Sequence, residues 1–198
     1  MNKKWLVPGI VAGVVLLLVM IFGGTYNGLV GSRENVNTKF ANIQSQYQRR
    51  ADLVPNLVST VQGAADFEKS TLTEVTNARA NATKVTIDPS KATPEQLAEY
   101  QNAQGELSQA LGRLLAVAEN YPQLTATQNF KDLQVQLEGT ENRIAVARND
   151  FNEAARGYNT TVQTFPTNIV AGLFGFKTFT YFEASAGSDK APTVEFGN

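Results

Sequence analysis

The feature that most constrains this chain is an apolar run near its N-terminus, WLVPGIVAGVVLLLVMIFGG, at positions 5–24. A helix of that length rises about 30 Å, which matches the hydrocarbon core of a bilayer. No charged residue lies between Trp5 and Ser32, and the rings of Trp5 and Tyr26 flank the run where aromatic side chains favour the membrane interface. The run therefore predicts a transmembrane helix over residues 5–24, preceded by a short flank of residues 1–4.

The side chains expected to contact lipid include Trp5, Leu16, Leu17, Leu18, Phe22 and Tyr26. A cleaved secretory signal is the alternative, but the run is longer than the apolar region of a typical signal peptide, and FGGTYNG offers no clear A-x-A-like cleavage site. Lys3 and Lys4 precede the helix, whereas Arg33 and Lys39 follow it together with Glu34. The positive-inside rule then favours a cytoplasmic N-terminus, with the remaining domain outside the inner membrane of the cell.

The composition excludes much catalytic chemistry. The 198 residues include 17 basic and 18 acidic side chains but no Cys and no His. Disulfides, thiolate-bound metals, acylated lipoprotein anchors, imidazole bases and histidine-containing zinc sites are therefore ruled out. The chain also lacks the basic surplus with which proteins bind nucleic acid. We expect a non-enzymatic protein with no cofactor, no bound metal and no nucleic-acid partner. If the protein were an enzyme, it would have to use carboxylates or a Ser-Lys pair as its catalytic groups.

Heptad spacing of apolar residues predicts a long helix directly after the anchor. This helix begins at about Leu29 and is expected to run to about Lys84. Pro55 lies in its middle and lacks the N–H that would bond to the Ala51 carbonyl, so we expect a kink at that position. The segment TIDPSKATP at 86–94 then breaks the helical pattern.

Two further helices follow this break. The sequence TPEQ at 93–96 predicts a helix start, because Thr can cap the helix, Pro suits its first position and Gln completes a capping box. That helix is expected to end before Pro122. The third is expected to be capped by Thr125 and to run to about Thr164, where Pro166 stops it. Its bulky heptad row is Phe130, Leu137, Ile144, Phe151 and Tyr158.

Long amphipathic helices with short breaks favour an all-α fold, an elongated antiparallel bundle over residues 26–164. A coiled-coil oligomer that uses one apolar seam is the alternative. The breaks near 86–94 and 119–125 favour packing within one chain, because they are short enough to connect neighbouring antiparallel helices.

The segment 165–183 is aromatic and nearly uncharged. Its candidate interface residues are Phe165, Phe174, Phe176, Phe179, Tyr181 and Phe182. Two interpretations are open, since exposed apolar clusters mark membrane or subunit contacts, whereas a buried cluster would close the end of the bundle. KTFTYF at 177–182 alternates as a strand does, but we expect the segment as a whole to be a short, irregular aromatic tail. Residues 184–198 have the small, polar composition of a disordered tail.

The most distinctive motif is QRRADLVPNLV, which carries two adjacent arginines. Arg49 and Asp52 are spaced as a helix-surface pair. Arg50 falls on the apolar seam, where a buried guanidinium needs an acidic or carbonyl partner. Glu138 and Glu141 of the third helix are the candidate partners. In the alternative interpretation, the Arg50 side chain reaches solvent at the edge of the bundle.

Four stretches resemble the LemA family in order and spacing: YNGLVGSRENV (26–36), RRADLVPNLV (49–58), residues 119–159 and FPTNIVAGLFGFKTFTYFE (165–183). The resemblance implies one N-terminal membrane anchor and a four-helix, bromodomain-like, up-and-down bundle, with two of its helices hinged around Pro55. It supplies no catalytic residues. A relative, MamQ, is implicated in forming magnetosome membranes, and family members are often encoded beside membrane metalloproteases of the HtpX type.

Three functions follow as hypotheses. The first is a membrane-anchored scaffold whose partners are the lipid bilayer and further copies of the chain, and which organises or reshapes the membrane. The second is an adaptor that docks a membrane protease or other membrane machinery. The third, an enzyme that uses carboxylates such as Glu138 and Glu141, is disfavoured because this i,i+3 spacing is common on solvated helix faces.

Overall fold

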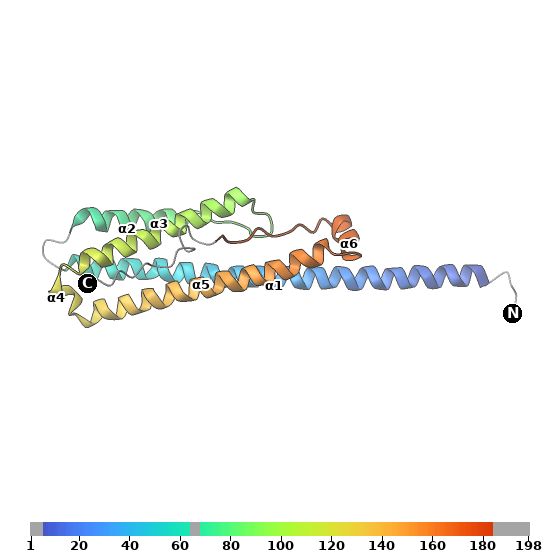
Figure 1. The fold of residues 1–198 in the computed structure, drawn as a ribbon, viewed down its shortest axis with the longest axis horizontal. Coiled ribbons are helices and arrows are strands. Elements are labelled where there is room, and N and C mark those ends of the chain that lie inside the picture. The colour runs from blue at the N-terminus through green and yellow to red at the C-terminus, as the bar shows by residue number, and fades with distance from the viewer. Residues whose placement is uncertain (1–5, 64–67, 184–198) are drawn as a thin grey trace, which may run out of the picture.

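The computed structural model describes residues 6–63 and 68–183 (Figure 1). Its helices are α1 (Leu6–Gln62), α2 (Lys69–Lys84), α3 (Pro94–Ala118), α4 (Pro122–Thr125), α5 (Gln128–Gln163) and α6 (Thr167–Phe174). These two ranges contain no strand. The predicted all-α class is thus confirmed. Trp5, the N-terminal flank and the tail over 184–198 lie outside the described residues.

Helix α1 has 57 residues and is therefore about 85 Å long. Its N-terminal part projects beyond every other described element (Figure 1). This part is long and apolar enough to cross a membrane and is not covered by protein. Leu16, Leu17 and Leu18, for example, are all exposed. The chain therefore has an N-terminal transmembrane helix, and that helix continues without a break into the bundle.

The bundle is built from four long helices that run up and down. Helix α1 packs most extensively against α5, and α2 packs most extensively against α3, while α1 also contacts α2. The short helix α6 packs against both α5 and α1, close to the point where α1 leaves the bundle (Figure 1). The molecule is consequently elongated along α1.

Two hydrophobic clusters fill the bundle. The membrane-proximal cluster joins α1, α3, α5, α6 and the segment 176–183, and Phe40 at its centre contacts the rings of Tyr100 and Phe151. The membrane-distal cluster joins α1, α2, α3, α4 and α5 around residues such as Leu57 and Leu107. The predicted bulky row of α5 is buried throughout and is divided between the two clusters.

The first predicted helix is in fact two helices. Helix α1 passes through Pro55 and ends at Gln62, and α2 begins at Lys69, so both the single helix to Lys84 and the hinge around Pro55 are wrong. Helix α1 continues through Pro55 because the Ala51 carbonyl, which Pro55 leaves without its usual backbone N–H donor, has another partner. Arg79 of α2 donates from Nε to this carbonyl at 2.8 Å, so a side chain replaces the missing backbone bond and α1 continues.

The helix caps match the expectation in one of two places. Thr93 caps α3: Gln96 N–H donates to Thr93 Oγ1 at 3.3 Å, and Thr93 N–H donates to Gln96 Oε1 at 3.0 Å. The predicted cap of the third helix is wrong. Thr125 ends the short helix α4, and Thr127 caps α5 by accepting a bond from the Phe130 N–H.

After α6 the chain reverses and runs along α5. Gly175 has φ 70°, in the left-handed region that favours glycine, and it ends α6. Phe176, Phe179 and Phe182 are then buried, one in every three residues. Residues 176–183 are thus irregular, as expected, and the alternation within KTFTYF does not correspond to a strand, because a strand would bury every second residue.

Two asparagines of α5 hold this extended segment. Asn159 donates from Nδ2 to the Phe179 carbonyl at 2.9 Å and accepts from the Phe179 N–H at 2.8 Å. Asn152 makes the same pair of bonds with Phe182, at 2.8 and 2.9 Å. Side chains from a helix thus supply the hydrogen bonds that a neighbouring strand would otherwise provide.

Candidate functional site

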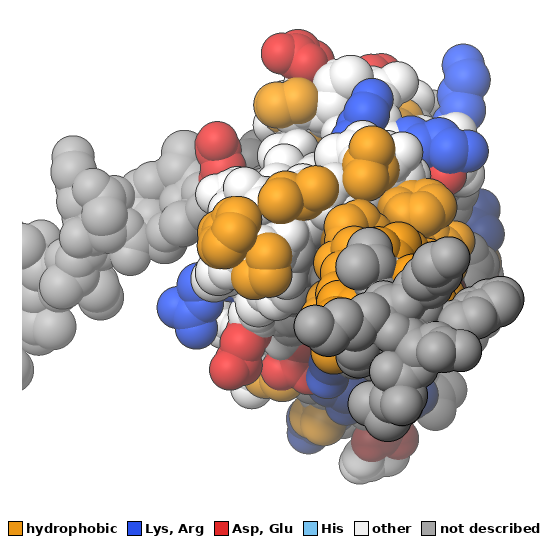
Figure 2. Space-filling view, turned by 90° about the vertical axis from the view of Figure 1, so that its right-hand side faces the viewer, with side chains coloured by type: hydrophobic (Ala, Val, Ile, Leu, Met, Phe, Trp, Pro, Cys, Tyr) orange, Lys and Arg blue, Asp and Glu red, His pale blue; other side chains and the backbone are white. Residues whose placement is uncertain are grey.

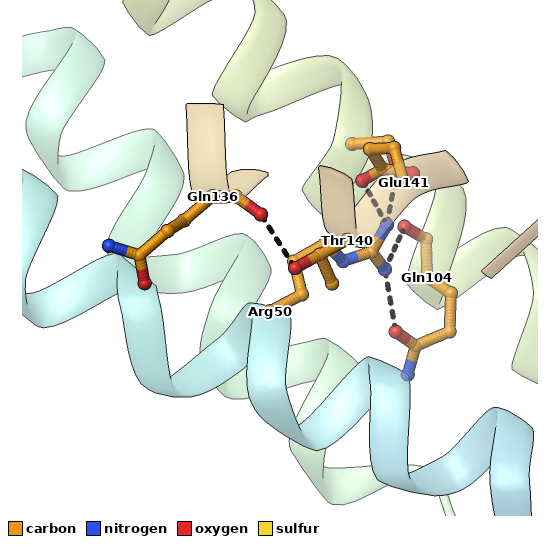
Figure 3. A network of polar contacts seen from close by, with 6 residues as sticks. Arg50, Gln104, Gln136, Thr140 and Glu141 are labelled. Carbon is orange, nitrogen blue, oxygen red and sulfur yellow. Dashed lines mark hydrogen bonds and ion pairs between the residues drawn. The ribbon is translucent and has the colours of Figure 1, made fainter. Parts of the chain in front are cut away.

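Arg50 lies in the interior of the bundle, between the two hydrophobic clusters (Figure 3). It occupies the apolar seam of α1, one heptad after Ile43 and one before Leu57, and only 1 % of its surface is exposed. Because an unpaired buried charge is strongly destabilising, the surrounding helices must supply partners for the guanidinium.

The partners of Arg50 come from two other helices. Nη1 donates to Glu141 Oε1 of α5 at 2.7 Å and to Ser108 Oγ of α3 at 2.5 Å. Nη2 donates to the backbone and side-chain oxygens of Gln104 of α3, at 3.0 and 2.8 Å (Figure 3). The guanidinium carbon also lies 5.2 Å from the centre of the Tyr47 ring. One arginine therefore ties α1 to both α3 and α5.

Further bonds extend this polar layer to α2. Gln104 donates from Nε2 to the Ala82 carbonyl at 2.9 Å, and Ser108 donates to Glu141 Oε1 at 3.1 Å. All four long helices thus share one connected set of hydrogen bonds. Such a layer fixes the register of helices whose apolar faces could slide past one another, since each polar group must meet its partner.

The other candidate residues of the arginine motif lie elsewhere. Glu138 is exposed and accepts a bond from Gln134, so Glu141 alone pairs with Arg50. Arg49 is exposed, and Asp52 accepts a bond from Gln48 at 2.7 Å. Pro55 is also exposed, on the surface of α1.

Sequence reasoning missed Gln104 and Ser108 as partners of Arg50. A signal for Gln104 was present, because it interrupts an apolar heptad row formed by Leu97, Leu111 and Ala118. A polar residue in a buried row needs a partner, and Arg50 in the seam of another helix is the natural one.

An open groove between α3 and α5 has Arg50 among the residues that line it. This α3–α5 groove has a volume of about 930 Å³ and is lined by α3, α5, the end of the extended segment, and Tyr47 and Arg50 of α1. Leu97 and Ile144 contribute apolar surface, whereas Glu141 and Arg148 contribute charge. The Glu141 side chain is 44 % exposed although Arg50 is buried. The groove therefore exposes the carboxylate of Glu141, whose negative charge is partly balanced by the buried Arg50.

Two buried tyrosines are the titratable groups of this region whose pKa values are shifted. Burial raises the pKa of the Tyr47 phenol, although the nearby Arg148 and Arg50 lower it, and burial likewise raises the pKa of Tyr100. Both phenols therefore hold their protons more tightly than an exposed tyrosine does. Within the described ranges, no group of three or more acidic side chains is arranged to hold a metal ion. The groove can recognise a ligand by hydrogen bonds and charge.

The structure divides the six aromatic candidates of the C-terminal segment into two groups. Those buried in the membrane-proximal cluster are Phe176, Phe179 and Phe182. Those exposed to a large extent are Phe165, Phe174 and Tyr181. The segment therefore both completes the core and leaves aromatic side chains on the surface.

Comparison with known proteins identifies the family. The model of the LemA family matches residues 39–196, which include the whole Arg50 layer. The chain belongs to the LemA family. This LemA-family protein is 30 % identical over 204 residues to magnetosome protein MamQ 2 of Paramagnetospirillum magneticum, covering 92 % of this chain and 72 % of the relative.

Two other relatives span most of the chain. MamQ of Magnetospirillum gryphiswaldense is 29 % identical, with 83 % of this chain and 66 % of the relative covered. LemA of Metamycoplasma hominis is 23 % identical, with 85 % of this chain and 74 % of the relative covered. The expected LemA resemblance is thereby confirmed.

Proposed function

We propose that this LemA-family protein is a non-enzymatic scaffold that self-assembles and organises the membrane in which it is anchored. Its N-terminus lies in the cytoplasm and its bundle stands outside the inner membrane, as the flanking charges favour. The observation that carries the proposal is the continuity of α1, which is one helix from the membrane span into the centre of the bundle.

The packing of α1 begins almost where its apolar run ends. Gly24 closes the run, and Leu29, five residues later, is buried in the membrane-proximal cluster. Val36 and Phe40 continue the same buried face. A simple tether would need a flexible linker between the span and the folded part, whereas a helix that belongs to both holds the bundle at a set angle to the bilayer.

The comparisons support a role at an organised membrane. Two of the similar proteins are named magnetosome proteins and align with most of this chain. The described residues also carry binding surfaces and no recognisable set of catalytic groups. A scaffold accounts for both observations.

The scaffold can be tested by uncoupling the bundle from the span. Five Gly and Ser residues are inserted between Gly24 and Thr25, and the full-length protein is placed in vesicles for cryo-electron tomography and single-molecule photobleaching. We expect the unaltered protein to form assemblies with upright bundles and altered membrane curvature. The inserted variant should remain anchored and helical but lose the common orientation and the curvature.

The matched control carries the same insertion after Lys91, in the exposed connection between α2 and α3, and should behave as the unaltered protein. Unaltered protein that is monomeric, randomly oriented and without effect on vesicle shape would refute the proposal.

The α3–α5 groove favours a second candidate, an adaptor that docks a membrane protease or another membrane machine. Gly105 of α3 lines this groove, and a side chain added there meets open space. Gly105→Trp should therefore fill the groove and abolish co-purification of a partner at a fixed ratio in detergent. Gly112→Trp, at an exposed position of the same helix, is the matched control and should retain the partner. A protein that assembles only with itself would exclude this candidate.

A further inference from the structure

Helix α6 presents an apolar face that no described part of the protein covers. Its sequence TNIVAGLF contains no charged residue, and its Val170 and Ala171 are buried against the bundle. On the opposite side, Leu173 is 70 % exposed and Phe174 is 58 % exposed. Ile169 is also exposed, as is Phe165 just before the helix. We call these four exposed side chains the α6 patch. Apolar groups gathered in this way usually mark a contact surface.

The α6 patch lies beside α1 at the end of the transmembrane run. The ring of Phe174 is 4.8 Å from that of Tyr26, and the ring of Phe176 is 5.5 Å from Tyr26. Phe22, one helical turn earlier on α1, packs against the same cluster. Helix α6 therefore meets α1 within about one turn of Gly24, the last residue of the apolar run.

The patch lies beside the exposed apolar surface of the membrane-spanning part of α1. Seen from the N-terminal end of α1, hydrophobic side chains gather on the surface beside the helix, and charged side chains lie mostly toward the edge of the view (Figure 2). Ile21 of α1 is about half exposed at this level and belongs to the membrane-spanning part. The same bilayer that surrounds Ile21 can therefore reach the exposed side of α6.

The charges around the patch fit the boundary of a bilayer. Lys177 is the only charged residue between Arg156 and Glu183, and it is exposed directly after α6. Arg33 of α1 lies over the Phe176 ring at 5.2 Å and also contacts Glu34. Aromatic and aliphatic side chains next to cations are typical of helices that lie in the headgroup region, where the apolar face enters the acyl chains.

The size of the patch argues against a second copy of the chain as its occupant. Four partly exposed side chains offer on the order of 400 Å². A stable protein interface buries about 800 Å² on each partner. A lipid surface has no such minimum, because the transmembrane span already holds the protein at the bilayer.

We infer that α6 lies in the headgroup region of the bilayer, with the α6 patch in contact with acyl chains, and forms a second membrane contact beside the span. This contact requires the transmembrane helix but not self-assembly. It would keep the base of the bundle on the membrane surface and oppose tilting of α1.

Tryptophan fluorescence tests this placement. Trp5 is the single tryptophan of the chain, so Trp5→Phe gives a silent background into which Leu173→Trp is introduced. The full-length variant is placed in phosphatidylcholine–phosphatidylglycerol vesicles that contain lipids brominated either near the headgroup or near the acyl-chain end. We expect a blue-shifted emission that falls by roughly half, more strongly with bromine near the headgroup, as for interfacial helices.

Two controls use other exposed hydrophobic positions in the same background. Met20→Trp, in the membrane-spanning part, should be quenched, and Val135→Trp, on α5 beside the membrane-distal cluster, should not. An unquenched Leu173→Trp beside a quenched Met20→Trp would overturn the inference while leaving the anchor and the scaffold intact. An unquenched blue shift that grows with the protein-to-lipid ratio would assign the patch to a second copy and would also overturn it. If brominated lipid did not quench Met20→Trp, the transmembrane anchor would be refuted, and the inference about α6 with it.

Discussion

Arg50 and Glu141 form an ion pair whose two members have very different surroundings. The arginine is buried and makes four hydrogen bonds, whereas the glutamate is half exposed in the groove. The free energy of the pair therefore depends on which member is removed, because only the arginine has been fully desolvated.

Removing the Glu141 carboxylate alone should lower the free energy of unfolding more than removing both charges of the pair. Glu141→Ala leaves a buried guanidinium without its anion, and we expect the free energy of unfolding to fall by about 1–3 kcal/mol. The double variant Arg50→Met with Glu141→Ala should recover part of that loss, because no buried charge remains. Thermal unfolding in detergent, followed by circular dichroism, gives both values. Equal losses in the single and double variants would contradict this account of the pair.

Arg79 should matter because of Pro55. Arg79→Met removes the donor to the Ala51 carbonyl, and we expect a loss of about 1–2 kcal/mol in unfolding free energy. In a Pro55→Ala background the new N–H at position 55 can bond to that carbonyl, so the same change at Arg79 should cost little. A double-mutant cycle measures the coupling, and additive effects would show that the two residues act independently.

The buried phenols predict sensitivity to alkali. The pKa of Tyr100 is raised by burial, so the folded state holds its proton more tightly than the unfolded chain does. Stability is then fully present below the ordinary tyrosine pKa of about 10 and falls as pH rises above it, by up to about 1.4 kcal/mol per pH unit for each such group. Melting temperatures from about pH 8 to pH 11 should show this decline. Tyr100→Phe should flatten the curve, and an unchanged slope would assign the decline to other groups.

At the scale of elements, the two asparagines of α5 are the features that hold the C-terminal segment. Asn159→Ala leaves the N–H and carbonyl of buried Phe179 unpaired, with an expected loss of about 2–4 kcal/mol. Amide exchange should accelerate over residues 176–183, while the amides of α5 stay protected. Asn142→Ala, at an exposed position on the same helix, is the control and should change neither. If the amides of residues 176–183 stayed protected from exchange in Asn159→Ala, the buried phenylalanines alone would be enough to hold the segment.

The element boundaries that could be predicted from the sequence are those with a local chemical cause. Thr93 and Pro94 start α3 by capping, and Pro166 follows the end of α5. The break after Gln62 was missed because the heptad pattern continues across it, so that the apolar spacing favoured one helix. The irregular form of the segment 176–183 was expected, but its contacts were not, because its hydrogen bonds come from side chains of a distant helix, which a local pattern does not record.

The same limit applies to the polar layer. Arg50 and Glu141 could be proposed as partners because both are charged and one lies on an apolar seam. Gln104 left a signal as a polar residue in an apolar row, whereas Ser108 left none, since its role depends on how α3 is turned toward α1. The bond from Arg79 to Ala51 depends in the same way on the fold of α2 back along α1.

At the scale of the whole molecule, α1 connects the membrane span to both hydrophobic clusters. The membrane-proximal cluster packs on its middle and the membrane-distal cluster on its C-terminal part, with the Arg50 layer between them. Helices α2, α3, α5 and α6 are thus assembled along one rod that begins in the bilayer (Figure 1). The arrangement fixes the position of the α3–α5 groove along this rod.

An uninterrupted α1 also works as a lever. From Tyr26 to Gln62 the helix extends roughly 55 Å beyond the span, so a change of about 10° in the tilt of the span displaces its far end by roughly 10 Å. Transmembrane helices adjust their tilt when the hydrocarbon thickness of the bilayer changes. Because the α6 contact beside the span opposes such a change of tilt, it would reduce the sideways movement of the groove when the thickness of the bilayer changes by a few ångströms.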